Sequence, residues 1–93
     1  MVKHIVMWKL HNKSDAREIK TTLEALKDKV PSIIDIEVGI DFSDSDASAD
    51  VVLYSTFADA QGLADYQAHP DHQNVLPMMR RLTSSRMVTD YVY

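Results

Sequence analysis

The spacing of apolar residues changes along the chain, and the order of these changes restricts the fold more than any other feature of the 93 residues. Apolar residues alternate with the two-residue period of a β-strand in some segments and recur every three or four residues, as on an α-helix, in others. The expected strands are 2–10, 33–42, 51–57 and 86–93, and the expected helical segments are 15–29, 58–68 and 70–84. This β-α-β-β-α-β order predicts an α+β, ferredoxin-like fold, in which a four-stranded antiparallel sheet carries its helices on one face.

The helical segment 15–29 is expected to begin at Asp15, which forms a capping-box pattern with Glu18, or at Ser14, and it ends before Pro31. Its apolar residues follow the helical spacing and form the expected buried stripe: Ile19, Leu23, Leu26 and Val30. In the strand 33–42, alternation predicts one buried set of side chains: Ile34, Ile36, Val38 and Ile40.

The first strand has large apolar side chains on both faces. One face carries a histidine among apolar residues: His4, Val6, Trp8 and Leu10. The opposite face includes Ile5 and Met7. If helices cover only one face, the apolar side chains of the other face stay in water, which small monomers seldom tolerate over a large area. The pattern therefore predicts a homodimer in which the open sheet faces of two copies pack together.

The composition argues against several classes of function. The net charge of -4 makes nucleic acid a poor partner, and the only basic cluster is formed by Arg80, Arg81 and Arg86. The chain has no cysteine, so it has no disulfide framework, which fits a cytoplasmic protein. The longest apolar run near the start is too short for a signal sequence or a membrane span. We expect one cytoplasmic domain over residues 1–93 without a membrane partner.

Metal and cofactor sites are not expected. His69 and His72 lack an obvious third ligand for zinc. The acidic segment that begins at Asp44 has Ala49 where a calcium loop needs glycine and Ser55 where it needs glutamate. With only two glycines in the chain, no phosphate-binding loop is present. We therefore predict no bound metal and no cofactor.

The segment 65–72 carries the main candidate site. Proline lacks an N–H and disfavours helical geometry in the residue before it, so a helix is expected to end near Ala68 and a new one to begin at Pro70. Pro77 should kink or divide the second helix. His72 then lies in a first helical turn, where the positive field favours a neutral imidazole that can accept a proton. Tyr66 is the matching donor, unless the two side chains only stabilise the helix break.

These residues make the chain resemble the stress-responsive A/B barrel (Dabb) family. The matching segments are Val2 to Val6, Val38 to Asp41, Asp65 to His72 and the final Asp90-Tyr91. The resemblance implies a dimeric α+β barrel with a ligand-sized cavity in each subunit. A plant polyketide cyclase of this family closes a ring by an aldol-type reaction without a cofactor, using a tyrosine and a histidine. By motif, the equivalent catalytic residues are Tyr66 and His72.

The resemblance also implies a pocket lining and leaves several functions open. His4 and four apolar residues are expected to contact the ligand: Val6, Trp8, Leu23 and Val38. His4 on its own would more often be a core residue, and Trp8 could fill the pocket. The protein could bind an apolar small molecule, act as a cofactor-free cyclase or lyase, act as a cofactor-free monooxygenase, or serve only in assembly. A cavity of roughly 300 Å³ or more would argue against the last alternative.

Overall fold

The computed structural model describes all 93 residues, Met1 to Tyr93. The sheet is formed by β1 (Val2–Leu10), β2 (Ile33–Ile40), β3 (Val51–Phe57) and β4 (Thr83–Val92). The helices are α1 (Ala16–Glu24), α2 (Ala60–Ala68), α3 (Pro70–Gln73) and α4 (Leu76–Leu82), with 3-10 turns η1 (Lys13–Asp15) and η2 (Ala25–Asp28). The strand order is β2-β3-β1-β4, and all neighbouring strands are antiparallel. The predicted α+β, ferredoxin-like architecture is confirmed.

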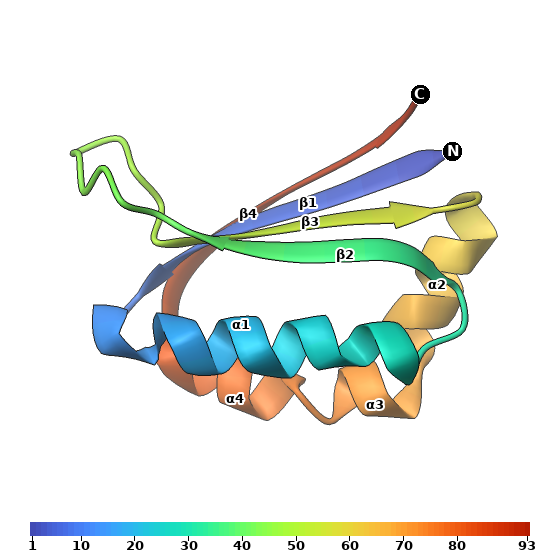
Figure 1. The fold of residues 1–93 in the computed structure, drawn as a ribbon, viewed down its shortest axis with the longest axis horizontal. Helices are drawn as coiled ribbons and strands as arrows, with labels where there is room; N and C mark the ends of the chain where they lie inside the picture. The colour runs from blue at the N-terminus through green and yellow to red at the C-terminus, as the bar shows by residue number, and fades with distance from the viewer.

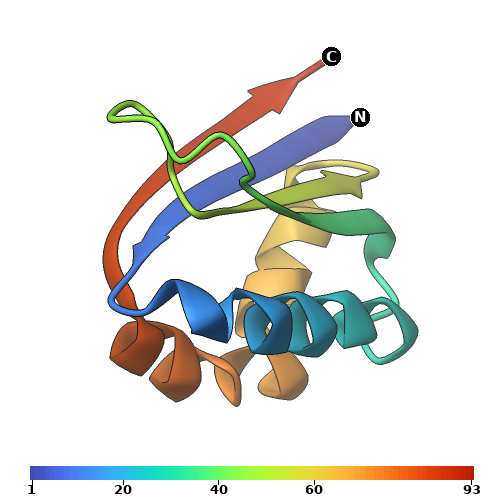
Figure 2. The same ribbon diagram turned by 60° about the vertical axis from the view of Figure 1, so that its left-hand side comes forward.

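The helices cover one face of the sheet and leave the other face open (Figures 1 and 2). On β1, the predicted alternation holds, because His4, Val6, Trp8 and Leu10 are buried toward the helices. Met7 and Tyr54 lie on the open face and are 42% and 38% exposed. None of the helices combines the length and the hydrophobicity that a membrane-spanning segment requires.

Helix α1 has the predicted apolar stripe but a different start. Asp15 makes no capping hydrogen bond with its side chain. Instead, Asn12 Oδ1 accepts from the Ser14 backbone N–H at 3.1 Å, and the 3-10 turn η1 leads into α1. The expected capping box at Asp15 is therefore wrong, because the chain adds one turn before the helix proper. The stripe packs on the sheet through Ile19, Leu23, Leu26 and Val30, all fully buried or nearly so.

The strand β2 differs from its expected alternation. Its register with β3 shifts between Ile33 and Asp35, which indicates a bulge. An extra residue turns the side chains before it to the opposite face. Ile33 is therefore buried, and Ile34, which was expected in the core, is 44% exposed. Ile40 is 39% exposed at the end of the strand, two residues before the predicted boundary.

The second helical region is divided at its two prolines. Asp59 caps α2 by accepting from the Gly62 backbone N–H at 2.8 Å. The helix ends at Ala68, as predicted, and His69 has the extended backbone that a residue before proline adopts. Pro77 lies in the first turn of α4, so it divides the predicted 70–84 helix into α3 and α4. β4 then begins at Thr83, three residues earlier than the predicted start at Arg86.

Candidate active site

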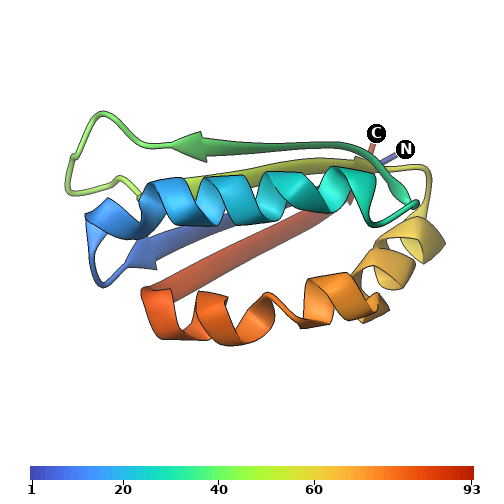
Figure 3. The same ribbon diagram turned by 60° about the horizontal axis from the view of Figure 1, so that its bottom comes forward.

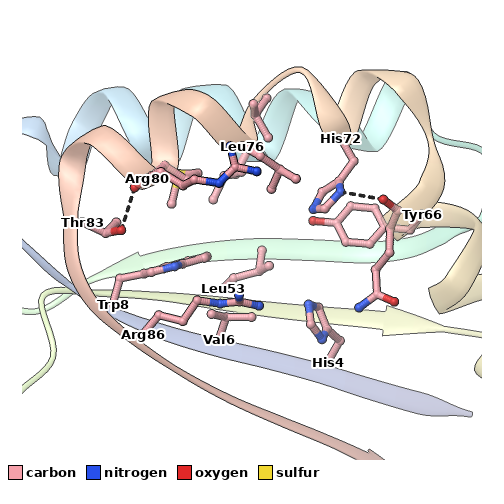
Figure 4. Close-up of a pocket in the computed structure, with 14 residues that line it drawn as sticks. His4, Val6, Trp8, Leu53, Tyr66, His72, Leu76, Arg80, Thr83 and Arg86 are labelled. Carbon is pink, nitrogen blue, oxygen red and sulfur yellow. Dashed lines mark hydrogen bonds between the residues drawn. The ribbon is translucent and has the colours of Figure 1, made fainter.

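A cavity lies between the sheet and the broken helical region (Figure 4). Its floor comes from β1, β3 and β4, and its other walls come from α1, α2, α3, α4 and Val75, which lies between α3 and α4. The volume is about 190 Å³, below the roughly 300 Å³ that we set for a typical ligand pocket. An apolar cavity of about 150 Å³ can nevertheless hold a benzene molecule. The space therefore suits one ring or a short chain, and not an extended polyketide.

The structure brings most of the predicted site residues to this cavity. Its lining includes the expected pair Tyr66 and His72 and four of the five other expected residues: His4, Val6, Trp8 and Leu23. Trp8 forms part of the wall and does not fill the space.

Val38 is the exception, because it is fully buried and does not line the cavity. It lies on the edge strand β2, and the strands β3 and β1 separate it from β4. There its backbone N–H donates to Glu24 Oε2 at 3.0 Å and its carbonyl accepts from Lys20 Nζ at 2.5 Å. Val38 thus belongs to the packed edge under α1, and its placement in the pocket lining is corrected.

Tyr66 is positioned by α2 and is 1% exposed. Its ring centroid lies 4.3 Å from that of His72, 5.2 Å from that of Phe57 and 6.2 Å from that of His4. Burial raises the pKa of Tyr66 to about 12. The hydroxyl is therefore protonated at neutral pH and able to donate a hydrogen bond. Tyr66 and His72 make ring contact without a hydrogen bond to each other, so the helix break is not held by such a bond.

His72 lies on α3 and is half-buried. Its Nδ1 lies 3.1 Å from the Gln67 carbonyl oxygen, which can only accept, so Nδ1 carries the proton. In the neutral ring, Nε2 then has the free electron pair. Burial is the main cause that lowers the pKa of His72 below its usual value of 6.5, and the charges of His4 and Arg86 act in the same direction. The neutral imidazole agrees with the sequence expectation, although burial, and not the helix terminus, is the main cause.

His4 is both a core residue and a cavity residue. It is 4% exposed, and its Nδ1 lies 2.5 Å from Asp90 Oδ1 on the neighbouring strand β4. The carboxylate orients the ring and leaves Nε2 as the nitrogen without a protein partner. Asp90 belongs to the final segment that resembles the family, but the sequence predicted no role for it. The register of β1 and β4, which places the two residues opposite each other, was the missing information.

The other histidines lie outside the cavity. His69 Nδ1 accepts from the Asp71 backbone N–H at 3.1 Å and caps α3. His11 lies in the exposed segment after β1. No group of three or more His, Cys, Asp or Glu side chains has the arrangement needed to hold a metal ion.

Two arginines of the cavity were not recognised as site residues from the sequence. Arg80 comes from α4 and Arg86 from β4, and both line the cavity. The signal was present, because these residues belong to the only basic cluster of an acidic chain. The prediction from the sequence related this cluster to nucleic-acid binding alone. The remaining unrecognised lining residues are mostly apolar: Leu53, Gln67, Val75, Leu76, Met79 and Thr83.

The fold and the site together define a ferredoxin-like α+β domain with a small, partly polar cavity beneath its helices. The chain belongs to the Dabb family, because the model of the stress responsive A/B barrel domain matches residues 2–93. None of the curated proteins matches the chain significantly.

Several solved structures are similar to the chain. A dimeric protein of unknown function with a ferredoxin-like fold from Bacteroides fragilis is 30% identical, with a TM-score of 0.86 over 99% of this chain and 95% of that chain. A hydroxynitrile lyase from Passiflora edulis is 16% identical, with a TM-score of 0.85 over 99% and 92% of the two chains. An antibiotic biosynthesis monooxygenase is 14% identical, with a TM-score of 0.78 over 100% and 98%. The last two similarities concern the fold alone.

Proposed function

We propose that the protein is a homodimer that binds one small molecule in the cavity of each subunit. The observation that carries this proposal is the meeting of Tyr66, His72 and His4 at one cavity, with apolar residues around them. Such a combination of apolar walls and a few convergent polar groups is typical of small-molecule sites. The volume of about 190 Å³ favours a ligand with one ring or a short chain.

The open sheet face supports the homodimer. Met7 and Met87 are directly opposite each other on β1 and β4 and are 42% and 68% exposed. Tyr54 on β3 and Tyr91 on β4 extend the same apolar surface. The Bacteroides fragilis protein, 30% identical to this chain, is described as dimeric. A second copy that covers this face would remove these side chains from water.

Sedimentation tests the homodimer. We expect a dimer at micromolar concentration for the unchanged protein and dissociation for Met87→Lys, because a charge would be buried in the interface. Ala64→Lys, on the exposed side of α2, is the matched control and should stay dimeric. A stable monomer of the unchanged protein would contradict the proposal.

Native mass spectrometry of protein taken gently from its own cells tests the ligand. We expect a dimer that carries a small-molecule mass in proportion to the number of subunits. The Leu53→Trp variant, which places a larger side chain in the cavity wall, should lose this mass while remaining folded. Persistence of the mass in Leu53→Trp would place the ligand elsewhere.

A second candidate function is proton transfer without a cofactor, and the protonation states of Tyr66 and His72 favour it. His72 Nε2 would take a proton from the carbon next to a carbonyl group, and the Tyr66 hydroxyl would donate a hydrogen bond to the enolate oxygen that forms. Returning the proton to carbon completes an exchange, and attack of the enolate on a second carbonyl completes an aldol-type reaction. This chemistry fits the lyase or cyclase alternative.

Deuterium exchange in heavy water tests this second candidate with a small ketone, acetophenone, as the probe. We expect the protein to accelerate exchange at the methyl group and His72→Gln to slow it by about a hundredfold or more, the usual range for loss of a general base. His69→Gln is the control outside the cavity. Equal rates for the unchanged protein and His72→Gln would exclude this role for His72. Oxygen uptake, measured in the same samples, tests the monooxygenase alternative.

A further inference from the structure

Two arginine side chains enter the cavity from opposite walls. Arg80 extends from α4 and Arg86 from β4, and Figure 4 shows both guanidinium groups directed toward the end of the cavity that holds Tyr66 and His72. Both residues are exposed, so the cavity that they line opens to solvent beside them. The apolar side chains of Val6, Leu53 and Leu76 line the space with them.

Neither arginine has a carboxylate partner. The ion pairs of the protein involve other residues, and no Asp or Glu lines the cavity. Asp90 shares the strand of Arg86, but four residues along a strand span about 13 Å. The Asp90 carboxylate is in addition bound to His4. The cavity is therefore a positively charged site in a chain whose net charge is -4.

Unpartnered guanidinium groups beside an apolar cavity favour an anion. Apolar walls beside a charged group lower the local dielectric, which strengthens its interaction with an ion of opposite sign. The planar guanidinium group also matches the two oxygens of a carboxylate, with two parallel N–H···O hydrogen bonds. The charges, the apolar walls and the volume together define a small organic anion as the ligand class.

We propose that the cavity binds a small carboxylic acid, with one ring or a short chain, whose carboxylate is held by Arg80 and Arg86 and whose remaining part lies against Tyr66 and His72. This inference rests on the proposed function, because it names the ligand class of the same cavity. It also assigns Arg80 and Arg86 as binding residues that decide between charged and neutral ligands.

An additional consequence concerns His72. The positive charge of Arg86 contributes to the lowered pKa of His72. A bound carboxylate beside Arg86 offsets that charge, so the pKa of His72 should rise when the anion binds. A neutral ligand of the same shape should not have this effect.

Benzoate and benzamide are suitable probes, because they have nearly the same shape and differ in charge. We measure their dissociation constants by NMR titration at pH 7.5, with Arg80→Gln, Arg86→Gln and, as the matched control on the same helix α4, Arg81→Gln. We expect benzoate to bind at least about tenfold more tightly than benzamide, and each cavity variant to weaken benzoate by about tenfold, the usual effect of losing a charge-assisted hydrogen bond. Benzamide binding should be unchanged in all variants, and Arg81→Gln should leave both ligands unaffected.

Four outcomes would overturn the inference. Equal affinity for benzoate and benzamide would remove the anion preference and leave the proposed small-molecule cavity standing. An equal loss of benzoate binding in Arg81→Gln would assign the preference to the general charge of the surface. Absence of binding by either probe would contradict both this inference and the proposed cavity function. The His72 ring resonances report the pKa of His72 with and without benzoate. If benzoate does not raise this pKa, the carboxylate lies away from Arg86.

Discussion

The helix layer covers the two halves of the sheet in different ways, and the site lies in the less completely covered half. Over β2 and β3, α1 continues into η2 as one helical stretch, and its stripe of apolar side chains is fully buried. On the side of β4, the layer is made of the short helices α3 and α4 (Figure 3). Apart from its first residue, Thr83, β4 is exposed along its whole length.

This difference shows how the cavity arises. An uninterrupted stripe with helical spacing presents one apolar side chain after another to the sheet and fills the space between them. Pro70 and Pro77 interrupt the other helical region, so its side chains cannot form such a stripe. The gap that remains is lined by polar groups as well as apolar ones. We therefore expect stability to depend on the α1 half and binding on the α3–α4 half.

Removal of apolar side chains gives the largest contrast. Ile19→Ala should lower the free energy of unfolding by about 2–5 kcal/mol, because it opens a cavity in the fully packed half. Leu76→Ala should cost less than about 1 kcal/mol, because Leu76 already borders an open cavity and is only partly buried. Urea denaturation followed by circular dichroism measures both values. Equal losses for the two variants would show that the halves are packed equally well.

The residues at the N-termini of α2 and α1 provide a smaller contrast in stability. Asp59→Ala should destabilise the protein by about 1 kcal/mol, because the Asp59 side chain caps α2 by accepting from the Gly62 N–H. Asp15→Ala should have almost no effect, because Asp15 makes no such bond. The same denaturation experiment compares them. If Asp15→Ala were the more harmful change, the capping box expected from the sequence would exist in solution.

Two histidines in the broken region separate binding from stability. His69→Ala should cost about 1 kcal/mol, because His69 caps α3 through the Asp71 N–H. His72→Ala should leave the stability nearly unchanged or raise it, as is common for residues whose role is binding or catalysis. Thermal unfolding of both variants provides the measurement. A loss of several kcal/mol in His72→Ala would instead assign His72 to the structural framework.

The pH dependence of stability tests the burial of His72. Because the pKa of His72 in the folded protein lies below 6.5, the unfolded chain binds a proton first as the pH falls. The contribution of His72 is therefore present above pH 6.5 and is lost as the pH falls through the lower, folded pKa. Unfolding measured between neutral and mildly acidic pH should show a shallower slope for His72→Gln than for the unchanged protein. An identical slope for the two would contradict the burial of His72.

Ionisation of Tyr66 should lower the stability as the pH rises, which is the opposite direction to the effect of His72. Its pKa is raised from 10.0 to about 12, so the contribution of the neutral phenol is present below pH 10 and is lost as the pH rises toward 12. Tyr66→Phe should reduce the loss of stability over this alkaline range. Unfolding experiments above pH 10 compare the two proteins. A loss that is equal in both would show that the Tyr66 hydroxyl ionises as easily as it does in the unfolded chain.

The parts of the fold that could be predicted depend on local patterns. The apolar stripe of α1, the alternation in β1 and the break before Pro70 were predicted, because each follows from residues close together in the chain. The bulge in β2 and the cap at Asn12 were missed, because one inserted residue or one extra turn leaves hardly any trace in the apolar pattern. Tyr66 and His72 were found because they lie in one short segment.

What the sequence alone determined is therefore the order of the elements, the family and one pair of candidate residues. Only the tertiary structure placed Asp90 against His4, which lies 86 positions away, and brought Arg80 and Arg86 into the same cavity. It also moved Val38 from the expected lining into the packed edge of the sheet. The physical reason is that local spacing decides which face a side chain occupies, whereas strand order and helix breaks decide which distant side chains meet.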